Sequence, residues 1–482
     1  MKNSPPNILL VILDSVRAKN CSTHGHDNET TPFLSRFVRR ATKFHQTRSP
    51  SIHSVSSHAS LFSGYHVEEH GVTEHTARLK PSANLWHELG HEYDYETGIF
   101  TPNAVITQAS NLGDVFDHYV GPKRKTTPRL YEDAFSPADI EGSVSAPQYL
   151  RELLKQDQRL YALLNGLYYK FSSPSGAYDP KRESADVYLD EFHSWLRNRT
   201  GPWAACLNLM DAHYPYVPEP EYDQWGGDAL AELRERIPDG PMSKTFLEGQ
   251  PWGQLRALEP LYDGCIRQLD AALETLVSRL KQLGEYENTL LVVTSDHGEG
   301  FGERSSLTPD VRLVDHSWGI DEVLTHVPLL VKEPHQSSGR TIDEVATLTN
   351  FPNAVRGAIA GEDVADAFVP DDEPVISSTY RIVPPGDELP LDESEREPYF
   401  GPWRAVYREE DDHVTKYASR GDDEATFHVR DAQTTYVVED GGRDVVEPIF
   451  EKLTDAGVRV DADSDDVSDD VETRLEDLGY LR

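Results

Sequence analysis

Two continuous runs of apolar residues, Asn7–Leu13 and Thr289–Thr294, leave this chain few possible folds. Each run is short enough for one strand and is apolar at almost every position. A strand with this pattern buries both of its faces, as in a parallel sheet covered by helices on both sides. A long helical pattern at residues 258–283, closed by Gly284, precedes the second run. The alternation predicts an α/β fold with a mostly parallel, doubly wound sheet flanked by helices.

Shorter elements follow the same alternation. Residues 31–40 are expected to form a helix that Pro32 opens. Residues 82–89 are expected to form a short helix with Ser82 as its N-cap. Further strands are predicted at residues 95–100 and 203–210.

Changes in composition divide the chain. Residues 1–370 carry the alternating pattern and form the larger expected α/β domain. Within it, residues 121–190 are weakly apolar and rich in Tyr, as in a helical insertion. Residues 371–400 are acidic and rich in Pro, which indicates a linker or long loop. Residues 401–482 are expected to form a smaller α+β subdomain that ends in a helix at 465–478. Its antiparallel sheet would take short strands at 403–407, 414–419, 426–429 and 435–438.

Acidic residues far outnumber basic ones. Asp and Glu total 83 against 46 for Lys and Arg, a formal charge of −37. Such a chain repels the phosphates of nucleic acids and of anionic membranes, so neither is an expected partner. The basic residues comprise 14 Lys and 32 Arg. An acid-rich, Lys-poor chain is similar to proteins from salt-loving archaea, and the alternative is an ordinary acidic bacterial protein.

Neither a membrane span nor a leader peptide is evident. No apolar run approaches the ~20 residues that a membrane helix needs. Only seven residues precede Ile8, and they lack a basic region and a cleavage site, so we expect a buried strand and a cytoplasmic protein. The three cysteines, Cys21, Cys206 and Cys265, have no metal-ligand spacing and are expected to be reduced core residues.

Acidic and imidazole side chains follow three of the predicted strands. Asp14 follows the first strand, Asp296 and His297 follow the strand at 289–294, and Asp211 and His213 follow another. Reactive groups in an open α/β sheet gather outside the carboxyl ends of the strands. Carboxylates and an imidazole that converge there can hold a divalent cation. A single Asp after a strand is also a common helix cap, an alternative that explains the Asp296–His297 pair less easily.

Residues 54–64 form a segment rich in Ser and His, with the sequence Ser-Val-Ser-Ser-His-Ala-Ser-Leu-Phe-Ser-Gly. Its polar start and apolar middle predict a loop that runs into the N-terminus of a helix. The amides and the dipole at such an end receive an anion and can activate a hydroxyl. A helix cap with incidental serines explains the same residues.

These motifs, in this order, resemble the sulfatase family of the alkaline phosphatase superfamily, and the likeness covers nearly the whole chain. The opening strand with Asp14 is similar to the family's first strand and its metal-binding Asp. Residues 54–64 resemble the nucleophile loop, whose usual form is Cys or Ser, any residue, Pro, any residue, Arg, then Leu-x-Thr-Gly. The resemblance implies an alkaline-phosphatase-like sheet with a smaller C-terminal subdomain. Further matching landmarks are residues 30–34, 262–264, 270, 290–299, 327–330 and 475–481.

The resemblance implies a divalent cation whose identity, Ca, Mg, Mn or Zn, stays open. Asp14, Asp296 and His297 correspond to the family's ligands, and Ser54 at the nucleophile position would bind the cation as an alkoxide. The cation would lower the pKa of the hydroxyl and neutralise the oxygens of the ester. Ser54 would then attack the phosphorus or sulfur centre and form a covalent intermediate.

Three histidines complete the implied catalytic set. His58 stands where the family usually has Arg, and with His213 it would bind the non-bridging oxygens of the ester. His316 lies where a Lys or His commonly assists the leaving group, so it would protonate the departing alcohol.

Several residues depart from the family pattern. Ser15 replaces a second Asp, and Ser56 and His58 replace the Pro and Arg of the nucleophile loop. Ser54 stands where most sulfatases carry a Cys that is oxidised to formylglycine, and its surroundings are not the recognition sequence for that oxidation. We therefore expect an unmodified serine. Because serine-bearing relatives include phosphatases and phosphodiesterases, a phosphate monoester or diester is favoured over a sulfate ester.

The sequence thus predicts a metal-dependent hydrolase of a sulfate or phosphate ester, with a small anionic ester or a glycan as substrate. One alternative is a transferase that passes a phospho-substituent to a glycan or a lipid. Another is a catalytically silent protein that keeps the fold and the cation. The replaced Asp and Arg favour the silent protein, whereas the retained Asp14, Ser54, Asp296 and His297 oppose it. The oligomeric state is left open.

Overall fold

The computed structural model describes residues 5–122 and 184–460, apart from 239, 372, 381–388 and 411–412, and scattered residues between 131 and 165. The described residues form two compact units. The first comprises the described parts of Met1–Gly121 and Ser184–Arg482, and the second those of Pro122–Glu183. Most of the insertion expected at residues 121–190 lies outside the described residues, as does the helix expected at 465–478. The first unit contains the strands of both large sheets.

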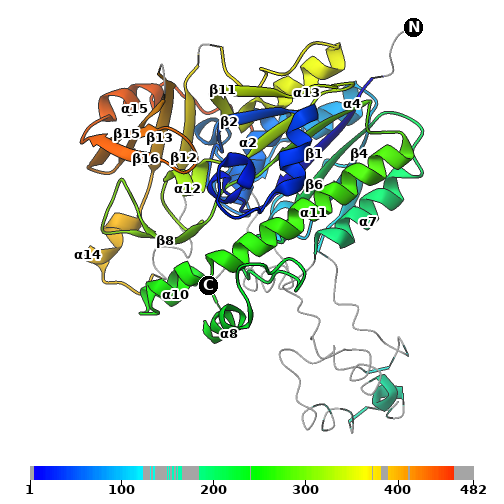
Figure 1. Cartoon of the computed structure of the whole chain (residues 1–482), viewed down its shortest axis with the longest axis horizontal. Coiled ribbons are helices and arrows are strands. Elements are labelled where there is room, and N and C mark those ends of the chain that lie inside the picture. Colours follow the sequence, from blue (N-terminus) through cyan, green and yellow to red (C-terminus); the bar gives the residue numbers. More distant parts are fainter. Residues whose placement is uncertain are drawn as a thin grey trace. The chain divides into compact units, whose positions relative to one another are not determined.

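An eight-stranded sheet runs through this unit in the order β11-β2-β10-β7-β1-β6-β4-β5 (Figure 1). Five neighbouring strands, from β7 to β5, are mutually parallel. Strand β10 is the exception, because it is antiparallel to both β7 and β2. The sheet is therefore mostly parallel, which confirms the predicted fold class. The strands are β1 Asn7–Leu13, β2 Thr42–Arg48, β4 Glu96–Phe100, β5 His118–Val120, β6 Trp203–Leu209, β7 Thr289–Thr294, β10 Leu329–Lys332 and β11 Arg340–Thr347.

The apolar character of β1 follows from its position in the middle of this sheet. Leu9 and Val11 belong to the core on one face, with α1 (Pro32–Phe37), α7 (Ala185–Leu196) and α11 (Glu259–Leu283). Leu10 and Ile12 belong to the core on the other face, with α2 (Ser54–Ser63), α4 (Leu85–Glu92) and α13 (Phe351–Ala360). Figure 1 shows α7 and α11 side by side over one face. Both faces are covered, so every position of the strand is buried.

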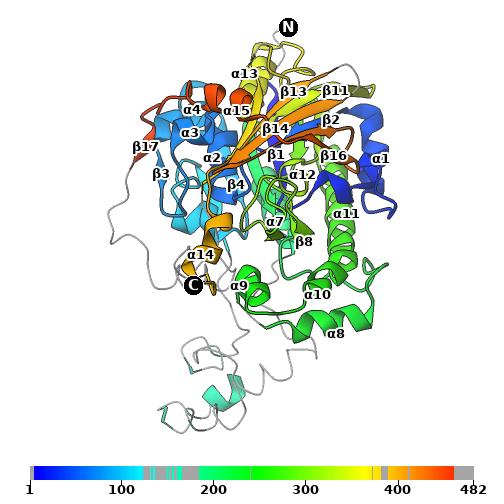
Figure 2. The ribbon, with the colours of Figure 1, turned by 90° about the vertical axis from the view of Figure 1, so that its left-hand side faces the viewer.

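The C-terminal sheet is antiparallel and has the strand order β12-β13-β14-β15-β16 (Figure 2). It confirms the predicted antiparallel sheet near the C-terminus, but it begins earlier than expected. Strand β12 lies within residues 371–400, which were expected to form a linker or long loop, and it pairs along its length with β13. Helix α15 (Arg443–Phe450) packs on one face of the sheet through Val446 and Phe450. The strands are β12 Val375–Thr379, β13 Trp403–Glu409, β14 Val414–Arg420, β15 Asp423–Val429 and β16 Thr435–Glu439.

Two helix boundaries differ from expectation, and one agrees. Helix α4 starts three residues late because Asn84, and not Ser82, caps it by accepting a hydrogen bond from the Trp86 amide at 3.0 Å. Helix α1 is shorter than the expected 31–40 because its last part tightens into a 3₁₀ turn, Val38–Arg40. Gly284 ends α11 as predicted, with φ of 78°, a left-handed conformation that favours glycine.

Short elements complete the described chain. Among the described residues, no helix has both the length and the apolar composition to cross a bilayer. The short helices are α3 Val67–His70, α8 Asp228–Arg236, α9 Met242–Leu247, α10 Trp252–Ala257, α12 Glu322–Thr325 and α14 Glu393–Arg396. The short strands are β3 Arg78–Leu79, β8 Gly300–Arg304, β9 Arg312–Asp315 and β17 Arg459–Val460.

Candidate active site

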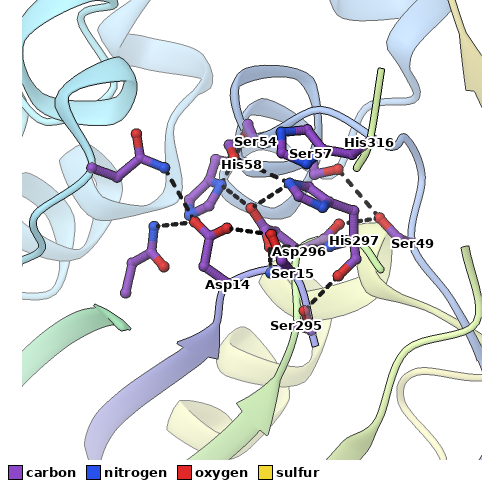
Figure 3. A network of polar contacts seen from close by, with 12 residues as sticks. Asp14, Ser15, Ser49, Ser54, Ser57, His58, Ser295, Asp296, His297 and His316 are labelled. Atoms are coloured by element: carbon purple, nitrogen blue, oxygen red, sulfur yellow. Dashed lines mark hydrogen bonds and ion pairs between the residues drawn. The ribbon is translucent and has the colours of Figure 1, made fainter. Parts of the chain in front are cut away.

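The predicted metal ligands meet at the carboxyl end of the sheet, as the parallel strands require (Figure 3). Asp14 follows β1 directly, and Asp296 and His297 follow β7 after one intervening residue. One ligand atom from each of the three residues lies within 4.8 Å of the others. All three side chains are wholly buried. The structure therefore brings together the three groups that the sequence placed on two strand ends.

Asp14 is held by amide and hydroxyl donors. The side-chain amides of Asn103 and Asn208 each donate to its Oδ2 at 3.2 Å, and the Ser15 hydroxyl donates to its Oδ1 at 3.1 Å. The two asparagines were not among the predicted site residues. Asn208 is a polar residue within the apolar strand β6, and Asn103 follows the end of β4. These positions in the sequence could have marked both as candidate site residues. Ser15, with φ of 64°, also donates its own amide to Asp296 Oδ1 at 3.3 Å.

Asp296 has one satisfied oxygen and one that is poorly satisfied. Its Oδ1 accepts the amides of Ser15 and His297, the latter at 3.0 Å. Its Oδ2 receives no hydrogen bond of good geometry from any described residue. That oxygen lies 3.4 Å from His297 Nε2 and 3.7 Å from His58 Nδ1. A buried carboxylate oxygen of this kind is costly unless a cation or a proton meets it.

The two buried carboxylates differ in their affinity for protons. Burial works to raise the pKa of Asp14, but nearby imidazoles, that of His213 foremost, bring it below its ordinary value. Burial and the charge of Asp14 raise the pKa of Asp296 well above its ordinary value. The second carboxylate therefore favours the protonated state in the absence of a cation.

His297 presents a lone pair to the site. Its Nδ1 lies 2.9 Å from the Gly298 carbonyl, which can only accept, so Nδ1 carries the proton. In the neutral ring this tautomer turns the lone pair of Nε2 to Ser54 Oγ, 3.2 Å away. A backbone carbonyl commonly fixes the tautomer of a metal-binding histidine in this way.

Ser54 is the first residue of α2, so the expected loop is already helix at this point. The preceding His53 is extended, and Gly64 closes the helix with φ of 82°. The helix has ten residues and is anchored by the buried side chains of Val55 and Phe62. Its N-terminal end therefore directs a partial positive charge towards the Ser54 hydroxyl.

His58 lies one turn further along α2 and is wholly buried. Its Nδ1 donates to the Ser54 carbonyl at 2.8 Å, and its Nε2 has no hydrogen-bond partner among the described residues. Burial lowers its pKa to about 4, although the charge of Asp14 opposes this shift. The imidazole is therefore neutral near pH 7 and turns an unprotonated nitrogen away from Ser54.

The other two predicted histidines form a row of rings with His297. The His316 ring centroid lies 4.2 Å from that of His297 and 5.3 Å from that of His213. The His316 Nδ1 lies 3.6 Å from a carboxylate oxygen of Glu299, whose other oxygen accepts the Tyr216 hydroxyl at 2.7 Å. Glu299 was not among the predicted site residues, although it stands only two positions after His297.

Asp211 does not join this group. One of its oxygens accepts the Ala185 amide at 2.9 Å at the start of α7, and the other accepts the Gln268 side-chain amide at 2.7 Å. Its carboxylate therefore connects α7 to α11, which agrees with the alternative of a helix cap.

The Sulfatase family model matches residues 6–360. The chain belongs to the sulfatase family. Its sequence is 19% identical to arylsulfatase K of Bos taurus over 468 residues, which cover 93% of this chain and 77% of that protein. It is 18% identical over 390 residues to the N-acetylglucosamine-6-O-sulfatase of Bacteroides thetaiotaomicron, which cover 72% of this chain and 66% of the relative. The fold is similar to that of the phosphonate monoester hydrolase of Agrobacterium radiobacter, with a TM-score of 0.58 and 18% identity over 88% of this chain and 89% of that one.

Family membership and these relatives support a hydrolase of sulfate or phosphate esters. A divalent cation fits the donor set that this chain presents. The poorly satisfied Asp296 Oδ2, the unprotonated His297 Nε2 and an Asp14 oxygen converge from two strand ends. Ser15, at the position of the family's second Asp, contributes hydrogen-bond donors to both carboxylates in place of a charged ligand.

Proposed function

We propose that this sulfatase-family chain is a metal-dependent hydrolase that cleaves a phosphate monoester or diester with Ser54 as its nucleophile. The observation that carries the proposal is the position of the Ser54 hydroxyl. It lies at the N-terminus of α2 and 3.2 Å from His297 Nε2, beside the cluster formed with Asp14 and Asp296. A hydroxyl placed between a helix N-terminus and a cation site is suited to attack on an anionic centre.

Asp14, Asp296 and His297 would hold the cation, with the Ser54 oxygen as a further ligand. When bound, the cation supplies a Lewis acid that lowers the pKa of the serine hydroxyl and offsets charge on the ester. Two carboxylates and one imidazole are compatible with Zn, Mn, Mg or Ca, so the identity of the metal is left to experiment. Asn103 and Asn208 would keep Asp14 oriented.

Ser54 and the three histidines would each have a separate role in the reaction. Ser54 would release its proton to solvent water, and its Oγ would form a bond to phosphorus as the bond from phosphorus to the leaving oxygen breaks. His316, whose Nδ1 lies 3.6 Å from Glu299, would donate a proton to the departing alcohol. His213 would bind a non-bridging oxygen. The neutral His58, whose N–H is donated to the Ser54 carbonyl, would position Ser54 instead of binding an ester oxygen. Water would then pass a proton to the deprotonated His316 and attack the phosphoryl group on Ser54. The bond from phosphorus to Oγ breaks, phosphate is released, and Ser54 Oγ takes a proton from solvent to regenerate the hydroxyl.

An unmodified serine supports phosphate over sulfate chemistry. A formylglycine hydrate can eliminate sulfate from its hemiacetal, whereas a serine ester must be hydrolysed at the phosphorus or sulfur atom itself. Metal-assisted attack is well suited to phosphoryl groups. Among the relatives, one is named a phosphonate monoester hydrolase and another acts on a sulfated sugar by its name, so the substrate panel includes both chemistries and a glycan.

The test is a comparison of wild-type protein and Ser54→Ala on aryl phosphate, aryl phosphodiester, aryl phosphonate and aryl sulfate, in high salt with Mg²⁺, Mn²⁺, Zn²⁺ or Ca²⁺. We expect metal-dependent turnover of a phosphate ester, lost in the variant. Aryl sulfate turnover far above phosphate turnover would overturn the assignment, as would undiminished activity of Ser54→Ala. A rate that depends on an added sugar or lipid alcohol would indicate a transferase. No turnover of any ester by a metal-loaded protein would indicate a silent binder.

A further inference from the structure

The backbone of the metal-binding loop rests on helix α12. The amides of Gly298 and Glu299, which directly follow His297, donate to the Leu324 and Val323 carbonyls at 2.8 and 3.1 Å. Gly298 permits this approach, because a Cβ on it would lie 2.0 Å from the Val323 oxygen. The position of α12 therefore determines where the loop that carries Asp296 and His297 lies.

Helix α12 is in turn held by the C-terminal sheet. Lys416 of β14 is 2% exposed, and its ammonium donates to the Ile320 carbonyl and lies 3.1 Å from Glu322 Oε1. Arg48 pairs with the other oxygen of Glu322 at 2.8 Å. Tyr407 of β13 places its hydroxyl 2.9 Å from Thr325 Oγ1. Buried contacts from two strands of this sheet thus secure both ends of α12.

The same sheet also contacts the segment that precedes the nucleophile. Ser377 of β12 donates its hydroxyl to the Ser49 carbonyl at 2.6 Å, and the Ser378 amide donates to the Pro50 carbonyl at 2.9 Å. Ser49 donates its amide to the Thr325 carbonyl at 2.8 Å, and its hydroxyl contacts the Asp296 carbonyl. Ser49 therefore connects the nucleophile segment, α12 and the metal-binding loop.

We propose that the C-terminal sheet positions the active site of this enzyme, with Lys416 and Ser377 as its positioning residues. Lys416 acts through α12 on the loop of Asp296 and His297, and Ser377 acts through Ser49 on the segment that leads into Ser54. Neither residue touches substrate or metal. The inference rests on the proposed function of the site, but its first two measurements do not require turnover.

The test compares Lys416→Met with Lys332→Met. Lys332 of β10 is a matched control, since it is also wholly buried and donates to backbone carbonyls, those of Tyr286, Glu287 and Thr289. It pairs with Leu291 near the start of β7, away from the strand end that leads to Asp296. Amide exchange of a peptide covering residues 296–300, Mn²⁺ affinity by calorimetry, and kcat and KM are measured for both full-length variants.

We expect Lys416→Met to speed amide exchange in that peptide and to weaken Mn²⁺ binding about tenfold, the usual effect of losing a group behind the metal ligands. The value of kcat should fall while KM stays within twofold, and Lys416→Arg should recover most of the loss. Lys332→Met should lower stability without these local effects. Equal exchange and Mn²⁺ affinity in Lys416→Met and wild type would overturn the proposal, as would equal losses in both lysine variants.

Ser377→Ala and Ser378→Ala give a milder pair and carry the test if Lys416→Met does not fold. The first removes the hydroxyl that holds Ser49, whereas the second keeps the backbone amide that holds Pro50. Only Ser377→Ala should lower kcat and speed exchange near Ser54, and equal behaviour of the two would overturn the proposal. If wild type turns over no ester, the proposed function fails while exchange and Mn²⁺ affinity still decide the role of the sheet.

Discussion

Replacing Asp296 by Asn should stabilise the metal-free protein and abolish its response to metal. Carboxylate oxygens of Asp14 and Asp296 lie within 4.8 Å of each other in a wholly buried site, where two unit charges repel by about 3.5 kcal/mol at an effective dielectric constant of about 20. The raised pKa of Asp296, caused by burial and by the charge of Asp14, means that a proton already relieves part of this repulsion. The expected gain in the free energy of unfolding is therefore about 1 to 3 kcal/mol.

The geometry of the site favours this substitution. The amide oxygen of Asn can keep the hydrogen bonds from the Ser15 and His297 amides. Its nitrogen would take the place of Asp296 Oδ2, where a donor can meet the unprotonated His297 Nε2 at about the present 3.4 Å. The variant removes one charged metal ligand without leaving a cavity.

Urea unfolding with a chelator and with excess Mn²⁺ measures both effects. Wild type should gain about 2.7 kcal/mol when Mn²⁺ is present at one hundred times its dissociation constant. Asp296→Asn should start higher and gain almost nothing. Asp270→Asn is the control, since Asp270 is a buried carboxylate with a pKa raised to about 7 by burial and accepts the Phe33 and Leu34 amides. It should keep the metal response. A metal-free Asp296→Asn less stable than wild type, or an unchanged response to Mn²⁺, would refute the reasoning.

Three further predictions concern the nucleophile, the surface charge and acid stability. Peptide mass spectrometry should show unmodified Ser54, and quenched turnover should trap a phosphoryl group there; formylglycine at this position would point to a true sulfatase. With 37 excess negative charges, the melting temperature should rise as KCl approaches molar levels, because the Debye length falls from about 30 Å at 0.01 M to about 3 Å at 1 M; a flat curve would count against a halophilic protein. Burial lowers the pKa of His70 to about 3, so the unfolded chain takes up a proton below about pH 6.5 that the native state refuses, and stability falls towards pH 3 by up to about 1.4 kcal/mol per pH unit. In His70→Gln the urea midpoint should fall less steeply between pH 7 and 4.5, and an unchanged slope would contradict this origin.

Features that depend on the pattern of neighbouring residues were predicted correctly. The run Asn7–Leu13 indicated a strand with both faces covered, and it lies mid-sheet between β6 and β7. The convergence of Asp14 with Asp296 followed from the parallel sheet, since parallel strands end at one edge. By contrast, β12 was missed because its five residues lie in an acidic, Pro-rich stretch and become a strand through pairing with β13. The N-cap of α4 was misplaced because Ser82 and Asn84 are both good caps, and the 3₁₀ turn Pro81–Ala83 selects between them.

The sequence by itself determined the class of fold, the strand ends that carry acidic and imidazole groups, and the family, because these depend on residue type and short-range periodicity. Only the tertiary structure decided how those groups meet. Ser15 and Asp296 are 281 positions apart, yet a backbone amide of one binds the carboxylate of the other. The tautomer of His297 and the connection from Lys416 through α12 to the metal-binding loop depend likewise on atoms that approach within hydrogen-bonding distance after the sheets have packed. A sequence pattern indicates which residues are buried and which secondary structure they form. The hydrogen-bond distances in the site arise instead from packing between segments that are far apart in the sequence.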